Sequence, residues 1–116
     1  NQLTTLPPEI GQPTNLQTLD LSYNHLTALP PEIGQLKRLA YLDLRDNQLT
    51  TLPPEIGQLT NPRILYLEDN QLTSLPPEIE RPPKLESLWV GGNPLDATSQ
   101  ALLQRLRARG VWVAGP

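Results

Sequence analysis

The sequence predicts an α/β solenoid, in which the chain coils repeatedly and lines up one short strand per coil in a parallel sheet. The main observation is a repeat of 23 residues that runs without insertion or deletion. An asparagine marks it at five equally spaced positions: Asn1, Asn24, Asn47, Asn70 and Asn93. The unit from Leu39 to Asn61 also matches the unit before it at 15 of 23 positions. So regular a repeat predicts a stack of equivalent coils.

Each unit is expected to contain one short strand and an irregular return. Leu42 and Leu44 alternate as a half-buried strand requires. Pro53 and Pro54 remove two successive amide donors, which bars a helix there and excludes a two-helix repeat. A fully extended unit would span roughly 76 Å at about 3.3 Å per residue. Equivalent asparagines can therefore lie side by side only if the chain returns once per unit.

These residues form the pattern LxxLxLxxNxL, which is complete at residues 16–26 and 39–49 and resembles the leucine-rich repeat family. The return LPPEIGQL is similar to the 23-residue LPxxIxxL subclass of Ras-binding proteins, their plant relatives, Roco-type GTPases and many bacterial proteins. The resemblance implies a right-handed coil with the sheet on its concave face and polyproline II or 3-10 segments on its convex side. The resemblance predicts the fold but does not identify the ligand.

In chain order, residues 1–95 are expected to form the repeats and residues 96–116 a C-terminal helical cap. The first coil, residues 1–15, is partial and lacks a strand, and further coils start at positions 16, 39, 62 and 85. Little beyond Leu3, Leu6 and Ile10 would cover Leu19 and Leu21, although terminal repeats need a polar cover. We therefore expect either further protein upstream or self-association through this uncapped edge.

Three departures from the repeat are expected to weaken the packing without changing the fold. Pro13 replaces a core leucine. Pro62 also replaces a leucine, at a position where we expect the first residue of a strand and where proline is tolerated. Residues 80–83, Glu-Arg-Pro-Pro, replace Gly-Gln-Leu-Lys, so the convex side should be remodelled there.

The cap is predicted by a change to helical periodicity. Asp96 or Thr98 can begin the helix and Gly110 can end it. Three arginines in its last turns suit the negative end of the helix dipole. Residues 111–113, Val-Trp-Val, then predict a short strand or a packed tail.

Composition narrows the classes of partner. The net charge of −3, from 9 basic and 12 acidic residues, argues against nucleic acid and anionic membrane surfaces. No apolar run approaches the length of a membrane span. The chain has no cysteine, whereas secreted eukaryotic members of the family usually carry disulfide-bonded caps, so the resemblance favours a cytoplasmic or bacterial setting. Without an initiator methionine or a signal peptide, the chain is expected to be a fragment or a processed form.

No catalytic residue, cofactor or metal is expected. His25 is the single histidine, so there is no nucleophile–base pair and no zinc site. His25 shares its repeat position with Gln48 and Gln71 and is interpreted as a surface residue. The asparagines are expected to satisfy backbone groups of the turn.

Two columns of carboxylates pass between coils, Asp20 beside Asp43 and Asp46 beside Asp69. They could hold a hard cation, but neither offers the six or more oxygens that calcium prefers. We favour a solvated acidic rim.

The informative positions are those that alternate with the leucines of the strand and the two that follow. They number 16: Thr18, Asp20, Ser22, Tyr23, Tyr41, Asp43, Arg45, Asp46, Ile64, Tyr66, Glu68, Asp69, Ser87, Trp89, Gly91 and Gly92. Four of the five aromatic residues fall here. In register, Tyr66 should lie beside Trp89 and Tyr41 beside Ile64, forming an apolar patch of the kind that marks interaction sites. The predicted partner-binding residues are Tyr23, Tyr41, Asp43, Arg45, Ile64, Tyr66, Glu68 and Trp89.

These observations predict a non-enzymatic protein–protein interaction module that binds a protein or peptide on its concave face. One alternative reading of the aromatics is that they only stabilise the sheet by cross-strand packing. A second class of function is a regulatory or substrate-recruiting fragment of a larger enzyme, such as a Roco-type GTPase or a bacterial effector. A third is an engineered or self-associating scaffold.

Overall fold

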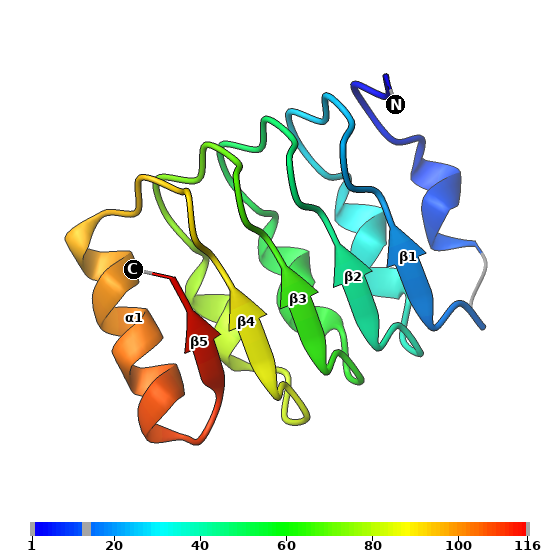
Figure 1. Cartoon of the computed structure of the whole chain (residues 1–116). Coiled ribbons are helices and arrows are strands. Elements are labelled where there is room, and N and C mark those ends of the chain that lie inside the picture. The colour runs from blue at the N-terminus through cyan, green and yellow to red at the C-terminus, as the bar shows by residue number, and fades with distance from the viewer. Residues whose placement is uncertain (1, 13–14, 116) are drawn as a thin grey trace.

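The computed structural model describes residues 2–12 and 15–115 and confirms the solenoid. Five strands form one parallel sheet in chain order: β1 Thr18–Asp20, β2 Tyr41–Asp43, β3 Ile64–Tyr66, β4 Ser87–Trp89 and β5 Trp112–Ala114. Four 3-10 turns lie behind it: η1 Pro8–Gly11, η2 Pro31–Gln35, η3 Pro54–Gln58 and η4 Pro77–Glu80 (Figure 1). The helix α1, Ala97–Ala108, lies between β4 and β5 in the chain. Two predictions concern residues outside the described ones. They are the place of Asn1 in the series of repeated asparagines and the loss of a core leucine at Pro13.

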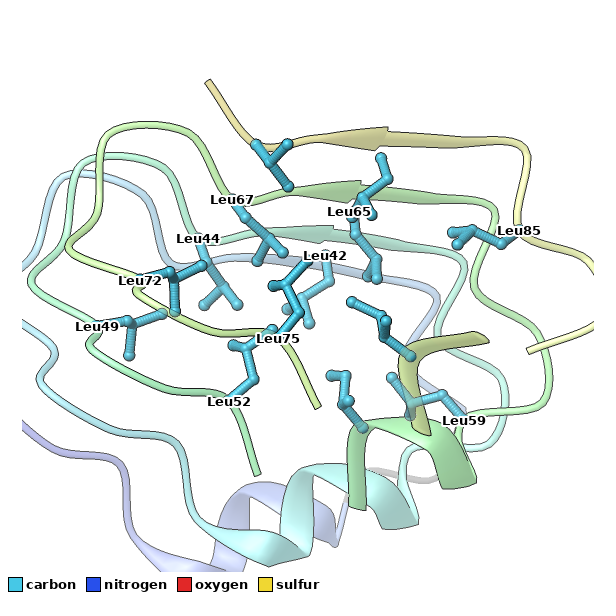
Figure 2. Close-up of a cluster of buried hydrophobic side chains, with 14 of the residues drawn as sticks. Leu42, Leu44, Leu49, Leu52, Leu59, Leu65, Leu67, Leu72, Leu75 and Leu85 are labelled. Atoms are coloured by element: carbon cyan, nitrogen blue, oxygen red, sulfur yellow. The ribbon is translucent and has the colours of Figure 1, made fainter. Parts of the chain in front are cut away.

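The core is a stack of leucines from strands and returns. Leu42 lies in register with Leu19 and Leu65, and Leu65 with Leu88. Leucines of the returns, such as Leu52 and Leu59, point toward the strand leucines (Figure 2). Burying one such side chain stabilises the fold by about 1.5 to 3 kcal/mol. The repeated core therefore holds one coil against the next.

The paired prolines explain why each return is a 3-10 turn. Pro53 precedes η3 in an extended conformation and Pro54 occupies its first position, where no amide donor is needed. The carbonyl of Pro53 then accepts a hydrogen bond from the amide of Ile56 at 3.0 Å. The convex side therefore has both conformations that the resemblance implies: an extended, polyproline-like proline followed by a 3-10 turn.

Glycines in these turns allow neighbouring coils to touch through their backbones. A Cβ on Gly34 would lie 2.6 Å from the carbonyl oxygen of Glu55, and one on Gly57 would lie 2.6 Å from that of Glu78. Real Cβ atoms do not approach a backbone oxygen so closely. The glycine of the return is therefore a packing requirement.

The departure at Glu80 serves the cap. The turn η4 has four residues where η3 has five, as the expected remodelling implies. Glu80 also gives this coil a contact with the cap, because Arg105 of α1 binds the Glu80 carboxylate with two hydrogen bonds of 3.1 and 3.0 Å. Arg109 donates to the carbonyls of Glu80 and Pro82. The hydrogen bond from Arg105 lowers the pKa of Glu80, so this contact persists well into mildly acidic pH.

Both ends of the cap are tied to the repeats, the first by Ser99 and the second by β5. Asp96, one of the two predicted capping residues, accepts a hydrogen bond from the Ser99 amide at 2.8 Å. The buried Ser99 hydroxyl accepts one from the Leu75 amide at 2.8 Å. The residues after α1 form a strand, β5, rather than an unpaired tail. No helix in the described part of the chain is long and apolar enough to cross a membrane.

Pro62 is buried and lies two residues before β3, so it does not begin the strand as the sequence analysis expected. The amides of Arg63 and Ile64 both donate to the carbonyl of Ala40, at 2.8 and 3.1 Å. The ladder thus starts after the proline and loses no donor to it.

The N-terminal edge of the sheet is less covered than its centre. Leu3 is 47% exposed, and Leu16 and Leu19 are only partly buried, whereas Leu42 and Leu65 are fully enclosed. Within the described residues, β1 pairs only with β2. This agrees with the expected open edge.

Candidate binding face

The side of the sheet that faces away from the leucine core is the inner face. It consists of two rows of side chains that alternate with buried leucines. The first row comprises Thr18, Tyr41, Ile64, Ser87 and Trp112, and the second Asp20, Asp43, Tyr66, Trp89 and Ala114. The loops after the strands extend it. Neighbouring strands lie about 4.8 Å apart, so members of one row can touch.

Two pairs of residues that were predicted to be neighbours on this face are confirmed as neighbours. The rings of Tyr66 and Trp89 are stacked, with centroids 6.0 Å apart and planes inclined by 28°. Tyr41 lies in register with Ile64. Trp89 also donates its indole N–H to the Ser87 hydroxyl at 3.3 Å, which holds the ring in place. The stacked pair is worth about 0.5 to 1.5 kcal/mol beyond the area that it buries.

Trp112 belongs to the same face, although the sequence analysis did not assign it there. It lies in register with Ser87 and is 65% exposed. The signal is the alternation of Trp112 with the buried residues Val111 and Val113. We name the set Tyr41, Ile64, Tyr66, Trp89 and Trp112 the aromatic patch.

Arg45 is held along the edge of this patch by Asp43. Its Nε and Nη2 donate to the two carboxylate oxygens of Asp43 at 2.9 and 2.7 Å. Its guanidinium carbon lies 5.3 Å from the centroid of the Tyr66 ring, within the range of a cation–π contact. The hydrogen bonds to Asp43 raise the pKa of Arg45, so the side chain stays charged.

Glu68 lies beside Arg45 in the next coil and is poorly solvated. Its Oε1 is buried and has no hydrogen-bond partner among the described residues. Burial raises the pKa of Glu68, an effect that the charge of Arg45 partly offsets and those of Asp43 and Asp69 reinforce. An incoming cation would relieve this penalty.

Replacing Glu68 by glutamine is expected to stabilise the fold at pH 7. A carboxyl whose pKa is raised on folding favours the folded state below its unfolded pKa, and that contribution is lost as pH rises through the folded pKa. E68Q should therefore unfold at higher urea concentration than the parent at pH 7 and at the same concentration near pH 3. The exposed Glu9→Gln is the control. Destabilisation at pH 7 would show that the attraction to Arg45 outweighs burial.

Tyr23 occupies a strained position outside the aromatic patch. It lies in the loop after β1 with φ of 59°, in the left-handed region, and is 61% exposed. Equivalent positions hold Asp46, Asp69 and Gly92, which tolerate that conformation better. Its amide donates to the carbonyl of Arg45 at 2.9 Å. Of the predicted binding residues, it is the one farthest in register from the stacked pair.

The asparagines have the structural role that the sequence predicts. Asn47 donates to the carbonyls of Leu21, Leu44 and Arg45 and accepts from the amide of Leu26. The carbonyl of Leu21 accepts hydrogen bonds from both Asn24 and Asn47, and that of Leu44 from both Asn47 and Asn70. The ladder therefore links every coil to the next.

The remaining polar candidates have local partners. Asp20 lies in register with Asp43, but it accepts hydrogen bonds from the Ser22 amide and hydroxyl, at 3.0 and 2.6 Å. Across residues 2–12 and 15–115, no three carboxylate or imidazole side chains gather in a way that could hold a metal ion. His25 is exposed, and its Nδ1 lies 3.4 Å from the side-chain Nε2 of Gln48.

Comparisons with known proteins agree with this architecture. The family model for leucine rich repeats matches residues 1–49, 14–72 and 37–95. A solved structure of a leucine-rich repeat protein from Leptospira interrogans superposes with a TM-score of 0.91 and 44% identity over 97% of this chain. The chain spans only 29% of that protein. A search of curated proteins found no match.

Proposed function

Because the chain belongs to the leucine-rich repeat family, we propose that it is a non-enzymatic recognition module whose inner face binds a protein or a peptide. The observation that carries this proposal is the placement of the aromatic side chains. The chain has five, and all of them lie on the inner face or in the loop that extends it. Tyrosine and tryptophan dominate the energetics of many protein interfaces.

Cross-strand stabilisation alone does not account for this arrangement. Tyr41 and Trp112 are 39% and 65% exposed, so much of their apolar surface stays in water. Tyr23 occupies a left-handed conformation that is unfavourable for a bulky residue. Exposed apolar area and backbone strain both reduce stability, and both are typical of surfaces kept for binding.

Within this proposal the residues divide into anchors and a rim. Tyr41, Ile64, Tyr66, Trp89 and Trp112 supply the apolar contact area. The charged side chains Asp43, Arg45 and Glu68, together with Tyr23, orient the partner. A partner that covers the patch removes its apolar surface from water at about 25 cal/mol per Å².

Replacing Tyr66 and Trp89 together by serine is expected to abolish partner binding, because it removes the stacked centre of the patch. In the test, peptides that bind the unmutated protein are selected from a random peptide library. The affinity of each selected peptide is then measured for the unmutated protein and for the double variant. We expect a loss of at least about 100-fold, since a hot-spot side chain contributes 2 kcal/mol or more. Trp112→Ser, which removes an exposed ring, should cost about tenfold.

Two measurements keep this test decisive. Circular dichroism and urea unfolding establish that each variant is folded, and the Trp112 variant is informative even if the double variant is not. Leu3→Ser is the matched control, because it removes an exposed apolar side chain from the first coil. Unchanged affinity in the folded variants would refute the assignment of the inner face.

A second candidate is that this segment recruits a partner for a larger protein. It is favoured by the similar Leptospira protein, of which the chain spans 29%. The inner face would then bind in the same way and bring its partner to the remainder of the chain. The open edge at β1 supports a further contact, with a preceding coil or with a second copy.

A further inference from the structure

Negative charge is concentrated on the inner face. Its 16 repeat positions hold one cation, Arg45, and five carboxylates: Asp20, Asp43, Asp46, Glu68 and Asp69. The chain has 12 acidic and 9 basic residues, so 7 acidic and 8 basic residues lie elsewhere. The face thus carries a charge of −4 while the rest of the chain carries +1. We name the five carboxylates the acidic band.

Four of the five carboxylates of the acidic band form no ion pair within the described residues. Among the residues that the structure describes, Asp43 is the one member of the acidic band with an ion pair, to Arg45 at 2.7 Å. Asp20 is bound by a serine, which leaves its charge in place. Glu68 has a buried oxygen without a partner in the same part of the chain. Like charges on neighbouring coils repel one another, and a cation from outside would relieve the repulsion.

The aromatic patch beside the band is also suited to cations. Arg45 on the Tyr66 ring shows that a guanidinium fits this surface. In the described structure it is the single cation over a ring. One face of Trp89 is covered by Tyr66, whereas Trp112 is 65% exposed and offers its ring to a second cation. Tryptophan is the strongest of the aromatic partners for Lys and Arg. The rings and the carboxylates therefore select the same kind of ligand.

We propose that the occupant of the inner face is an extended, basic protein segment whose Lys and Arg side chains meet the acidic band and the tryptophan rings. This inference rests on the proposed function and names its class of partner. Five strands at about 4.8 Å spacing span roughly 19 Å, which an extended chain covers in about six residues. Apolar side chains between the cations pack on Tyr41, Ile64 and Tyr66.

The test uses three pools of synthetic 12-residue peptides. In all three pools every second position is Tyr or Leu, and the pools differ in the positions between them. These positions are Lys or Arg in the first pool, Gln or Ser in the second, and Asp or Glu in the third. We expect the basic pool to bind at least tenfold more tightly than the neutral pool, and the acidic pool not to bind. The difference should shrink in 0.5 M NaCl because salt screens exposed charges.

Charge-neutralising variants locate the contact. Asp46→Asn with Asp69→Asn should reduce binding of the basic pool about tenfold, and asparagine tolerates the left-handed conformation of both positions. Glu32→Gln with Glu55→Gln makes the same change of charge in the η2 and η3 turns and should have no effect. Equal losses in the two pairs would overturn the proposal.

The outcomes also separate this inference from the proposed function. If the neutral pool binds as tightly as the basic pool and Tyr66→Ser with Trp89→Ser abolishes both, the recognition face stands and the preference for a basic segment is wrong. If no pool binds, and no peptide from the random library depends on the aromatic patch, the recognition face itself is wrong.

Discussion

Replacing Asn47 by alanine is expected to lower the free energy of unfolding by about 3 to 5 kcal/mol, a large part of the 5 to 15 kcal/mol of a typical domain. The side chain makes four hydrogen bonds in a buried site. The carbonyls of Leu21 and Leu44 keep a second donor, from Asn24 and Asn70. The backbone amide of Leu26 loses its acceptor, the side-chain oxygen of Asn47. An unsatisfied buried group of this kind costs about 1 to 3 kcal/mol.

Urea unfolding followed by circular dichroism measures this loss. Gln48→Ala is the control, because it removes an exposed amide from the next residue and should change stability by less than about 0.5 kcal/mol. A loss below about 1 kcal/mol for N47A would mean that the ladder does not carry the contacts between coils.

Replacing Gly57 by alanine is expected to cost about 2 to 3 kcal/mol, although alanine ordinarily favours folding over glycine. The new Cβ would lie 2.6 Å from the carbonyl oxygen and 2.7 Å from the Cβ of Glu78. Both belong to the neighbouring coil, so the turns η3 and η4 would have to separate. Overpacking of this kind usually costs 1 to 3 kcal/mol.

The chain provides a matched control for this change. Gly91 has an ordinary φ, and a Cβ there would meet nothing closer than the Gly115 Cα at 3.9 Å. G91A should therefore be neutral or slightly stabilising, because alanine reduces the entropy of the unfolded chain. Comparison of the two melting temperatures distinguishes contact between turns from a general effect of glycine. If the two variants melt alike, the close approach at Gly57 is not limiting.

The fold could be predicted because each coil repeats the same sequence pattern. Leu42 and Leu44 define a strand, Pro53 and Pro54 exclude a helix, and the constant period sets the register between coils. The register in turn places Tyr66 against Trp89 before any coordinates are known. These inferences need only alternation and spacing.

The features that sequence reasoning missed depend on contacts outside that period. Trp112 follows its partner Ser87 by 25 residues, because α1 replaces the usual return, so counting in units of 23 passes over it. Glu80 looked like a flaw in the repeat until the structure showed Arg105 against it. The left-handed backbone at Tyr23 follows from the turn geometry that Asp46 and Asp69 share, which apolar patterning does not reveal.

Contacts between successive coils are nearly identical along the array, whereas the cap contacts the coils that start at residues 62 and 85, through Arg105, Arg109 and β5. A gene that gained or lost one whole repeat unit before the coil that starts at residue 62 would preserve the contacts between neighbouring coils. The cap would need no compensating change. Duplication of units can therefore lengthen or shorten the recognition surface in single steps, and each step adds another strand on which new specificity can evolve.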